Sequence, residues 1–201
     1  MARNTVYTFK NHLGYDGRKK NDEKALQVLN EIGFNATNDI GETPLIVASY
    51  LGRPDFVKMI LEKTNNVDFK VEGSITGSAL MEACSQRRLD CIKLLIEAGA
   101  NLEQTDKYGN TPISAIFTNT FSDPIPCAEY FYSKGAKITE RVIEMGMSWN
   151  KERFTDFLKT IDYDLGNLSL PTEDTIQKEE IKIDSSIDIE HLHNVVNNRN
   201  Y

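Results

Sequence analysis

The chain has 201 residues, of which 40% are apolar and 26% charged, and its formal net charge is −7, a composition typical of a soluble folded protein. The acidic balance argues against nucleic-acid binding, which needs a basic face, and against an anionic membrane surface. No apolar run approaches the length of a membrane span, and residues 1–7 lack the apolar block of a secretory signal. The acidic charge leaves two alternatives open, solubility alone or attraction to a basic partner.

One sequence pattern recurs at a spacing of about thirty-four residues. Its copies read Gly41-Glu42-Thr43-Pro44-Leu45, Gly77-Ser78-Ala79-Leu80 and Gly109-Asn110-Thr111-Pro112-Ile113. The apolar residues that end the copies lie 35 residues apart from Leu45 to Leu80, and 33 apart from Leu80 to Ile113. A fixed period in this range predicts stacked repeats rather than a single-core globule. The expected function therefore shifts from catalysis to holding a partner.

Two helices are predicted before the clear repeats. The stretch from Asp22 to Ile32 has a helical apolar stripe and stops at Gly33, which indicates the second helix of a pair. The stretch from Thr8 to Tyr15 supplies the helix before it. Terminal repeats of a stack are usually atypical, so this pair is predicted to form a degenerate N-terminal cap.

Each clear repeat is predicted to be a loop followed by two helices. In the first repeat, Thr43 caps a helix that Pro44 opens and Gly52 ends. The stretch from Asp55 to Lys63 then has the apolar spacing of an amphipathic second helix. The second helices of the other two repeats end at the glycine stops Gly99 and Gly135.

The C-terminal part is predicted to contain a longer loop, a final helix pair and a polar tail. The third repeat is longer between its helices, around Thr118 to Pro126, which predicts a protruding loop. Thr139 to Gly146 and Asn150 to Ile161 form a final helix pair. From Asp162 the chain is polar and acidic, with isoleucines spaced as in short strands or along one short helix. Three interpretations of this tail stay open: a mobile segment, a segment folded over the last repeat, or one that orders on a partner.

Residues 38–52 and 106–116 follow the pattern of the ankyrin repeat, and residues 91–101 match its second half. The chain thus resembles the ankyrin-repeat family over residues 38–138. The resemblance implies an all-α, ankyrin-like helix-turn-helix solenoid of about five repeats with short hairpin loops. The predicted division is a degenerate N-terminal capping repeat at 1–37, three ankyrin-like repeats at 38–138, a degenerate C-terminal capping helix pair at 139–161, and a polar acidic tail at 162–201.

The chain departs from the family pattern at two kinds of position. The histidine that usually ties the hairpin loop is replaced by Ile46, Met81 and Ser114, which predicts less rigid loops. Thr76 and Arg87 stand where the pattern has glycine, which weakens the match of the middle repeat.

Few residues suggest chemistry. Cys84 and Cys91 fall on stripes that pack inward, whereas Cys127 lies near the predicted loop and is expected to be more exposed. Three scattered cysteines form no disulfide framework, so a reducing cytoplasm is the expected compartment. His191 and His193 are spaced to share one side of a strand, but a structural metal site needs more ligands, so we interpret them as surface histidines. No phosphate-binding loop or nucleophile elbow is present, and neither a cofactor nor a catalytic residue is predicted.

The resemblance instead predicts a protein-binding surface, because hairpin tips and first helices line one concave side of ankyrin-like stacks. The tip residues carried over are Asp39, Ile40, Glu42, Ser74, Ile75, Gly77, Lys107, Tyr108 and Asn110. The residues carried over at the ends of the first helices are Tyr50, Leu51, Ser85, Gln86, Thr118 and Asn119. Several are apolar or aromatic, and such residues gathered on one face suggest an interaction patch, although isolated exposed apolar residues are common.

The predicted function is protein binding without catalysis. A short acidic chain of this kind is similar to several inhibitors, which favours an immunity protein or antitoxin that blocks a basic toxin. The alternative is an effector or viral decoy that binds a host protein, similar to the inhibitors of Rel-type transcription factors. A metal-dependent enzyme that uses the two tail histidines is the remote third hypothesis.

Overall fold

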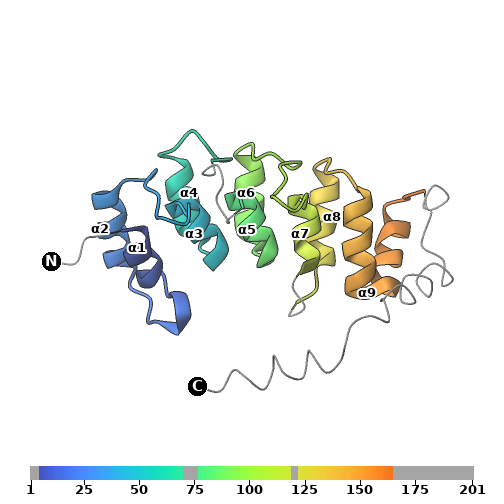
Figure 1. The fold of residues 1–201 in the computed structure, drawn as a ribbon, viewed down its shortest axis with the longest axis horizontal. Coiled ribbons are helices and arrows are strands. Elements are labelled where there is room, and N and C mark those ends of the chain that lie inside the picture. The colour runs from blue at the N-terminus through green and yellow to red at the C-terminus, as the bar shows by residue number, and fades with distance from the viewer. Residues whose placement is uncertain (1–4, 70–76, 119–121, 165–201) are drawn as a thin grey trace, which may run out of the picture. The chain divides into compact units, whose positions relative to one another are not determined.

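The structure, a computed structural model, describes residues 5–69, 77–118 and 122–164, and these residues are all helix, turn or loop (Figure 1). The chain divides into two units, Met1–Lys159 and Thr160–Tyr201, and only residues 160–164 of the second unit are described. The α-helices are α1 (Val6–His12), α2 (Asp22–Ile32), α3 (Pro44–Leu51), α4 (Pro54–Leu61), α5 (Ala79–Ser85), α6 (Leu89–Glu97), α7 (Pro112–Ala115), α8 (Ile125–Ser133) and α9 (Glu140–Thr160). Two short 3-10 helices, η1 (Tyr15–Gly17) and η2 (Ile116–Thr118), complete the described elements. No helix among them is both long and apolar enough to cross a membrane.

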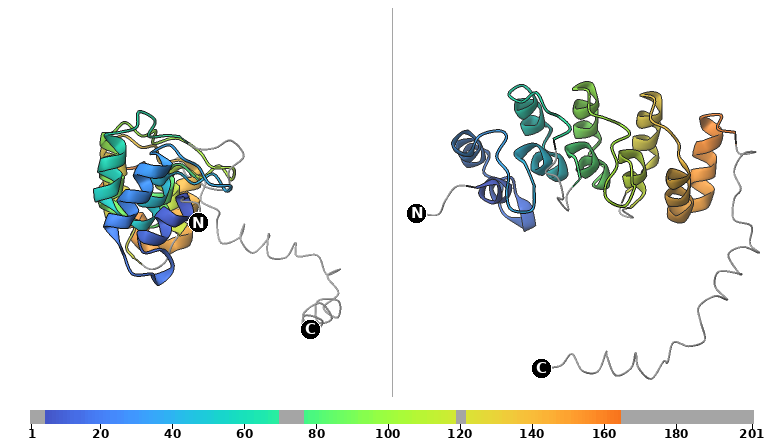
Figure 2. Two further views of the ribbon diagram at one scale, coloured as in Figure 1. Left: turned by 90° about the vertical axis from the view of Figure 1, so that its left-hand side faces the viewer. Right: turned by 45° about the horizontal axis from the view of Figure 1, so that its top comes forward.

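Successive helices of the first unit pack in pairs, α1 with α2, α3 with α4, α5 with α6 and α7 with α8. The first helices α1, α3, α5 and α7 also contact one another in chain order, as α4 contacts α6. Figure 2 shows the resulting two rows, one of first helices and one of second helices. The all-α prediction is therefore confirmed for the described residues.

The recurring apolar positions occupy equivalent places in this arrangement. Leu45, Leu80 and Ile113 are all buried, each on the first helix of its pair. Full burial of such a side chain stabilises the fold by about 1.5–3 kcal/mol. Because each first helix contacts the next, part of that stabilisation comes from the neighbouring pair and would be missing in an isolated pair.

Helix α3 begins as the sequence predicts. Thr43 is extended, its hydroxyl oxygen accepts the N–H of Ile46 at 3.2 Å, and Pro44 opens α3. Ser78 caps α5 in the same way, accepting the N–H of Met81 at 3.4 Å. These bonds satisfy N–H groups that a helix start leaves without a partner.

Helix ends show why one replaced glycine is tolerated. Gly52, Gly99 and Gly135 all have positive φ, as helix-terminating glycines do. Arg87 stands in register with Gly52 and also has a positive φ, +51°, which costs a residue with a Cβ about 1 kcal/mol. Its guanidinium offsets this strain, since Nε donates to the carbonyl of Ile116 at 2.9 Å and Nη1 donates to the backbone and hydroxyl oxygens of Ser122. Arg87 thereby anchors the longer connection of the third repeat.

The last helix, α9, consists of two helical halves. Asn150 interrupts α9 with extended backbone angles, φ −163° and ψ 104°. Phe154 and Phe157 of the second half are buried, and Gly146 of the first half leaves space for the Phe154 ring. Phe154 also meets Phe117 edge to face, with ring centroids 5.1 Å apart, so this pair packs on the preceding repeat.

Side chains of one loop hold the backbone of the next. The Asp68 carboxylate accepts the N–H of Asn101 at 2.9 Å, and 33 residues separate the two. The Glu103 carboxylate accepts the N–H of Lys137 at 3.0 Å across 34 residues. Two such bonds at the repeat spacing tie three successive loops together.

Two sequence predictions need correction here. Cys127 is buried rather than exposed, because α8 turns it inward; like Cys84 and Cys91, it is a free thiol. The first N-terminal helix spans Val6–His12 instead of reaching Tyr15, which belongs to η1. The tail interpretations and the His191–His193 pair lie outside the described residues.

Candidate protein-binding surface

The first hairpin tip is held by one side chain. The Asn38 amide oxygen accepts the backbone N–H groups of Ile40 at 3.2 Å and Glu42 at 2.8 Å. The backbone of Asn38 pairs in turn with Glu42, and Gly41 adopts a φ of +85° that favours glycine. This tip is therefore fixed without the usual histidine.

The third tip repeats this geometry. The Asp106 carboxylate accepts the N–H groups of Tyr108 and Asn110, both at 2.8 Å, and Gly109 has a φ of +79°. Arg141 of α9 donates to the Asn110 side chain at 2.9 Å. The residue Tyr108 remains 70% exposed, so a rigid loop presents an aromatic side chain to solvent.

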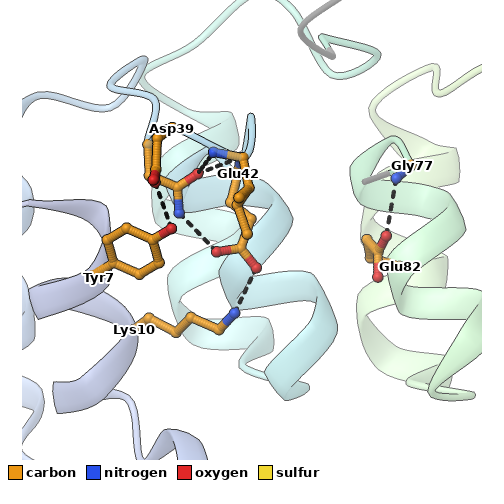
Figure 3. Close-up of polar contacts among 8 residues, drawn as sticks. Tyr7, Lys10, Asp39, Glu42, Gly77 and Glu82 are labelled. Atoms are coloured by element: carbon orange, nitrogen blue, oxygen red, sulfur yellow. Dashed lines mark hydrogen bonds and ion pairs between the residues drawn. The ribbon is translucent and has the colours of Figure 1, made fainter. Parts of the chain in front are cut away.

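Helix α1 covers part of the first tip (Figure 3). The Tyr7 hydroxyl donates to Asp39 at 2.5 Å, and this bond raises the pKa of Tyr7 to about 12. The Lys10 ammonium donates to the Glu42 carboxylate at 2.5 Å, and both side chains are about nine-tenths buried. The same ammonium lies 4.2 Å from the centre of the Tyr15 ring, a cation–π distance. The N-terminal pair is thus fastened to the first clear repeat by polar contacts.

Helix α5 places another carboxylate beside the second tip. Glu82 accepts the N–H of Gly77 at 3.0 Å (Figure 3). Burial raises the pKa of Glu82, whereas the hydrogen bond from the Gly77 N–H lowers it. Of the two nearby charges, Glu42 raises this pKa and Lys10 lowers it by a smaller amount.

The predicted binding residues differ in exposure. Tyr108, Asp39, Lys107 and Thr118 are exposed, whereas Ile40, Tyr50, Leu51, Gly77, Ser85, Gln86 and Asn110 are partly buried. Ser74, Ile75 and Asn119 lie outside the described residues.

Glu42 is buried, although the resemblance to the ankyrin repeat predicts it as a tip residue of the binding surface. It is only 7% exposed, because its carboxylate faces inward to Lys10 and to the Asn38 amide, which donates to it at 2.8 Å. Its role in the structure is to hold the tip and α1 together.

Sequence reasoning also overlooked three residues near the tips, Tyr7, Lys10 and Glu82. The two α1 residues precede the stretch in which the repeat pattern is clear, so no pattern marked them. Glu82 did have a sequence signal, because it is a charged residue at an apolar position of the pattern. The aligned residues in the other two repeats are Val47 and Ala115.

The described residues show no grouping of three or more histidine, cysteine, aspartate or glutamate side chains fit for a metal ion. Burial raises the pKa of the Cys84, Cys91 and Cys127 thiols, which makes them poor nucleophiles at neutral pH. The described hairpin tips instead offer fixed loops that carry aromatic and charged side chains.

Comparison with known families agrees with this geometry. The ankyrin-repeat family model matches residues 40–70 and 78–107, which include α3 to α6. The chain thus contains ankyrin repeats over these two segments. Repeats of this family generally serve as non-catalytic modules of protein–protein interaction, so another protein is the class of partner that the match implies. Among curated proteins, no significant match to the chain was found.

Proposed function

We propose that this protein binds another protein through its hairpin tips and first helices and inhibits it without catalysis of its own. The observation that carries the proposal is the third tip, where Asp106 fixes the backbone and Tyr108 stays 70% exposed. A rigid, exposed tyrosine gives contact area at a small entropic cost, and tyrosine is a frequent binding hot spot. Tyr50 and Leu51, both partly exposed at the end of α3, extend the proposed surface.

The arrangement that presents these residues is, in our proposal, a solenoid of about five repeats with the boundaries predicted from the sequence. The serial contacts of the first helices support it. The kinked α9 supports a terminal helix pair at 139–161, and α1 with α2 supports a degenerate repeat at 1–37. The three free cysteines support a cytoplasmic location.

The partner that we propose first is a basic toxin, which would make this chain an immunity protein or antitoxin. A net charge of −7 supports it, since opposite charges speed encounter and make it dependent on salt. An effector or decoy that binds a host protein is the alternative outcome of the same experiment. The protein purified from its native source would carry a basic toxin encoded beside it in the first case, and it would capture a host protein in the second.

The binding surface is tested by substitution. Tyr50→Ala combined with Tyr108→Ala should weaken binding of the co-purified partner by about thirtyfold, the effect of losing one hot spot. Thermal stability should change little, since both rings contact solvent. Tyr132→Ala on α8 removes a tyrosine of the second-helix row and is the matched control. Equal affinities of the double variant and the control in a titration would reject the proposed surface.

A further inference from the structure

Glu82 places a charged side chain at a position that is apolar in the two neighbouring repeats. The residue two positions after Leu45 is Val47, and the residue two positions after Ile113 is Ala115; both are buried. The middle repeat has Glu82 at this position instead. A carboxylate among positions that neighbouring repeats fill with apolar side chains costs stability unless a cation or hydrogen bonds compensate it.

One oxygen of Glu82 has a structural partner. It accepts the N–H of Gly77, the residue in register with Glu42 and Asn110. In the first and third tips the corresponding N–H groups donate to Asn38 and Asp106. The residue in register with those two is Gly73, which has no side chain, so Glu82 takes over their task.

The hydrogen bond to Gly77 explains why an oxygen atom is needed at position 82, but it does not explain why the side chain is charged. A glutamine could accept the Gly77 N–H equally well. The second carboxylate oxygen has no hydrogen bond or ion pair with the described residues, and it is not among their buried polar atoms that lack a partner. The described residues therefore hold the half-buried carboxylate on one side and leave its other side open.

Among the described residues, no cation forms an ion pair with the Glu82 carboxylate. In the part of the chain that the structure describes, the charges that act on Glu82 are Glu42, which disfavours its ionised form, and Lys10, which favours it. Lys10, however, is already paired with Glu42 at 2.5 Å. Glu82 and Lys10 thus share no contact within ion-pair distance in the described chain, and a further positive charge on the open side would stabilise the site.

We propose that Glu82 is the specificity-determining residue of the binding face and accepts an arginine or lysine side chain of the partner. The inference rests on the proposed function and adds the chemistry of the partner segment, which is basic. The exposed Asp39 on the neighbouring tip and the acidic balance of the whole chain favour the same sign of partner. The fixed oxygen orients the carboxylate before the partner arrives, which reduces the entropy lost on binding.

The test uses the full chain and a fluorescein-labelled nona-arginine peptide, titrated at low salt by fluorescence anisotropy. Glu82→Gln keeps an oxygen for Gly77 and removes the charge, so it should weaken peptide binding about tenfold, the effect of one charge-assisted contact. Glu97→Gln removes an equal charge from an exposed position at the end of α6 and should weaken binding less than about twofold. The thermal midpoint of each variant checks that it is folded.

A second measurement tests the contact between Glu82 and the basic peptide without any substitution, so it remains valid if a variant folds poorly. In the wild-type chain, the Glu82 carboxyl carbon resonance should shift when the peptide is added. No shift, or equal losses for Glu82→Gln and Glu97→Gln, overturns the inference, because the peptide then responds only to net charge. If the double tyrosine variant still loses its native partner in that case, the proposed surface stands and only the role of Glu82 is rejected.

Discussion

The ion pair between Lys10 and Glu42 gives a sharp prediction about stability. It joins α1 to the first tip at 2.5 Å, with side-chain exposures of 11% and 9%. We expect Lys10→Met to destabilise the protein because it keeps most of the packing volume but leaves the Glu42 charge buried without its cation.

The magnitude follows from what remains around Glu42. Breaking a buried ion pair by removing one partner costs about 3–5 kcal/mol. The Asn38 amide still donates to the carboxylate at 2.8 Å, so the lower end, about 3 kcal/mol, applies. For a chain of this size, the melting temperature should then fall by about 6–12 °C.

Urea denaturation followed by circular dichroism measures the change, and hydrogen exchange of α1 shows where it acts. The control is the double variant Lys10→Met with Glu42→Leu, which leaves no uncompensated charge and should be more stable than the single variant. A loss below about 1 kcal/mol for Lys10→Met, or a double variant less stable than the single one, would refute the reasoning.

Three further substitutions or conditions probe other parts of the fold. Arg87→Gly should be about 1 kcal/mol less destabilising than Arg87→Ala in thermal unfolding, because glycine accepts the φ of +51° that strains alanine; an alanine variant of equal or greater stability would contradict this. Gly146→Ala should cost about 1–3 kcal/mol, since its Cβ would lie 2.3 Å from the Phe154 ring, whereas alanine at the exposed Ser148 should be neutral. Burial raises the pKa of Cys127 from 9.0 to about 11, so between these values only the unfolded thiol ionises and stability should fall as pH rises. Urea denaturation at pH 8 and at pH 10.5 measures that loss, and Cys127→Ala should lose less than the wild type because only Cys84 and Cys91 still contribute; equal losses would argue against the buried Cys127 thiol.

The helix framework could be predicted because its signals are local. The apolar stripe from Asp22 and the glycine at position 33 define α2 as the structure has it. Thr43 and Pro44 mark the start of α3 through the hydrogen bond and the fixed φ that those residues supply. The break at Asn150 agrees with the two separate stripes of the final pair.

The contacts around the tips could not be predicted in the same way. The exposure of Glu42 depends on Lys10, which lies 32 residues away in a helix that the repeat pattern does not cover. The position of Cys127 depends on how α8 turns after a connection of unusual length. Both outcomes are decided by packing between repeats, whereas a repeat pattern describes each repeat alone.

The most decisive measurement of the binding surface is hydrogen exchange of the complex with the co-purified partner. Peptides with Tyr50 and Tyr108 should gain protection when the partner binds, while the solvent sides of α4 and α6 should exchange as in the free protein. Protection confined to α4 and α6, with the tips unchanged, would contradict the proposed binding surface.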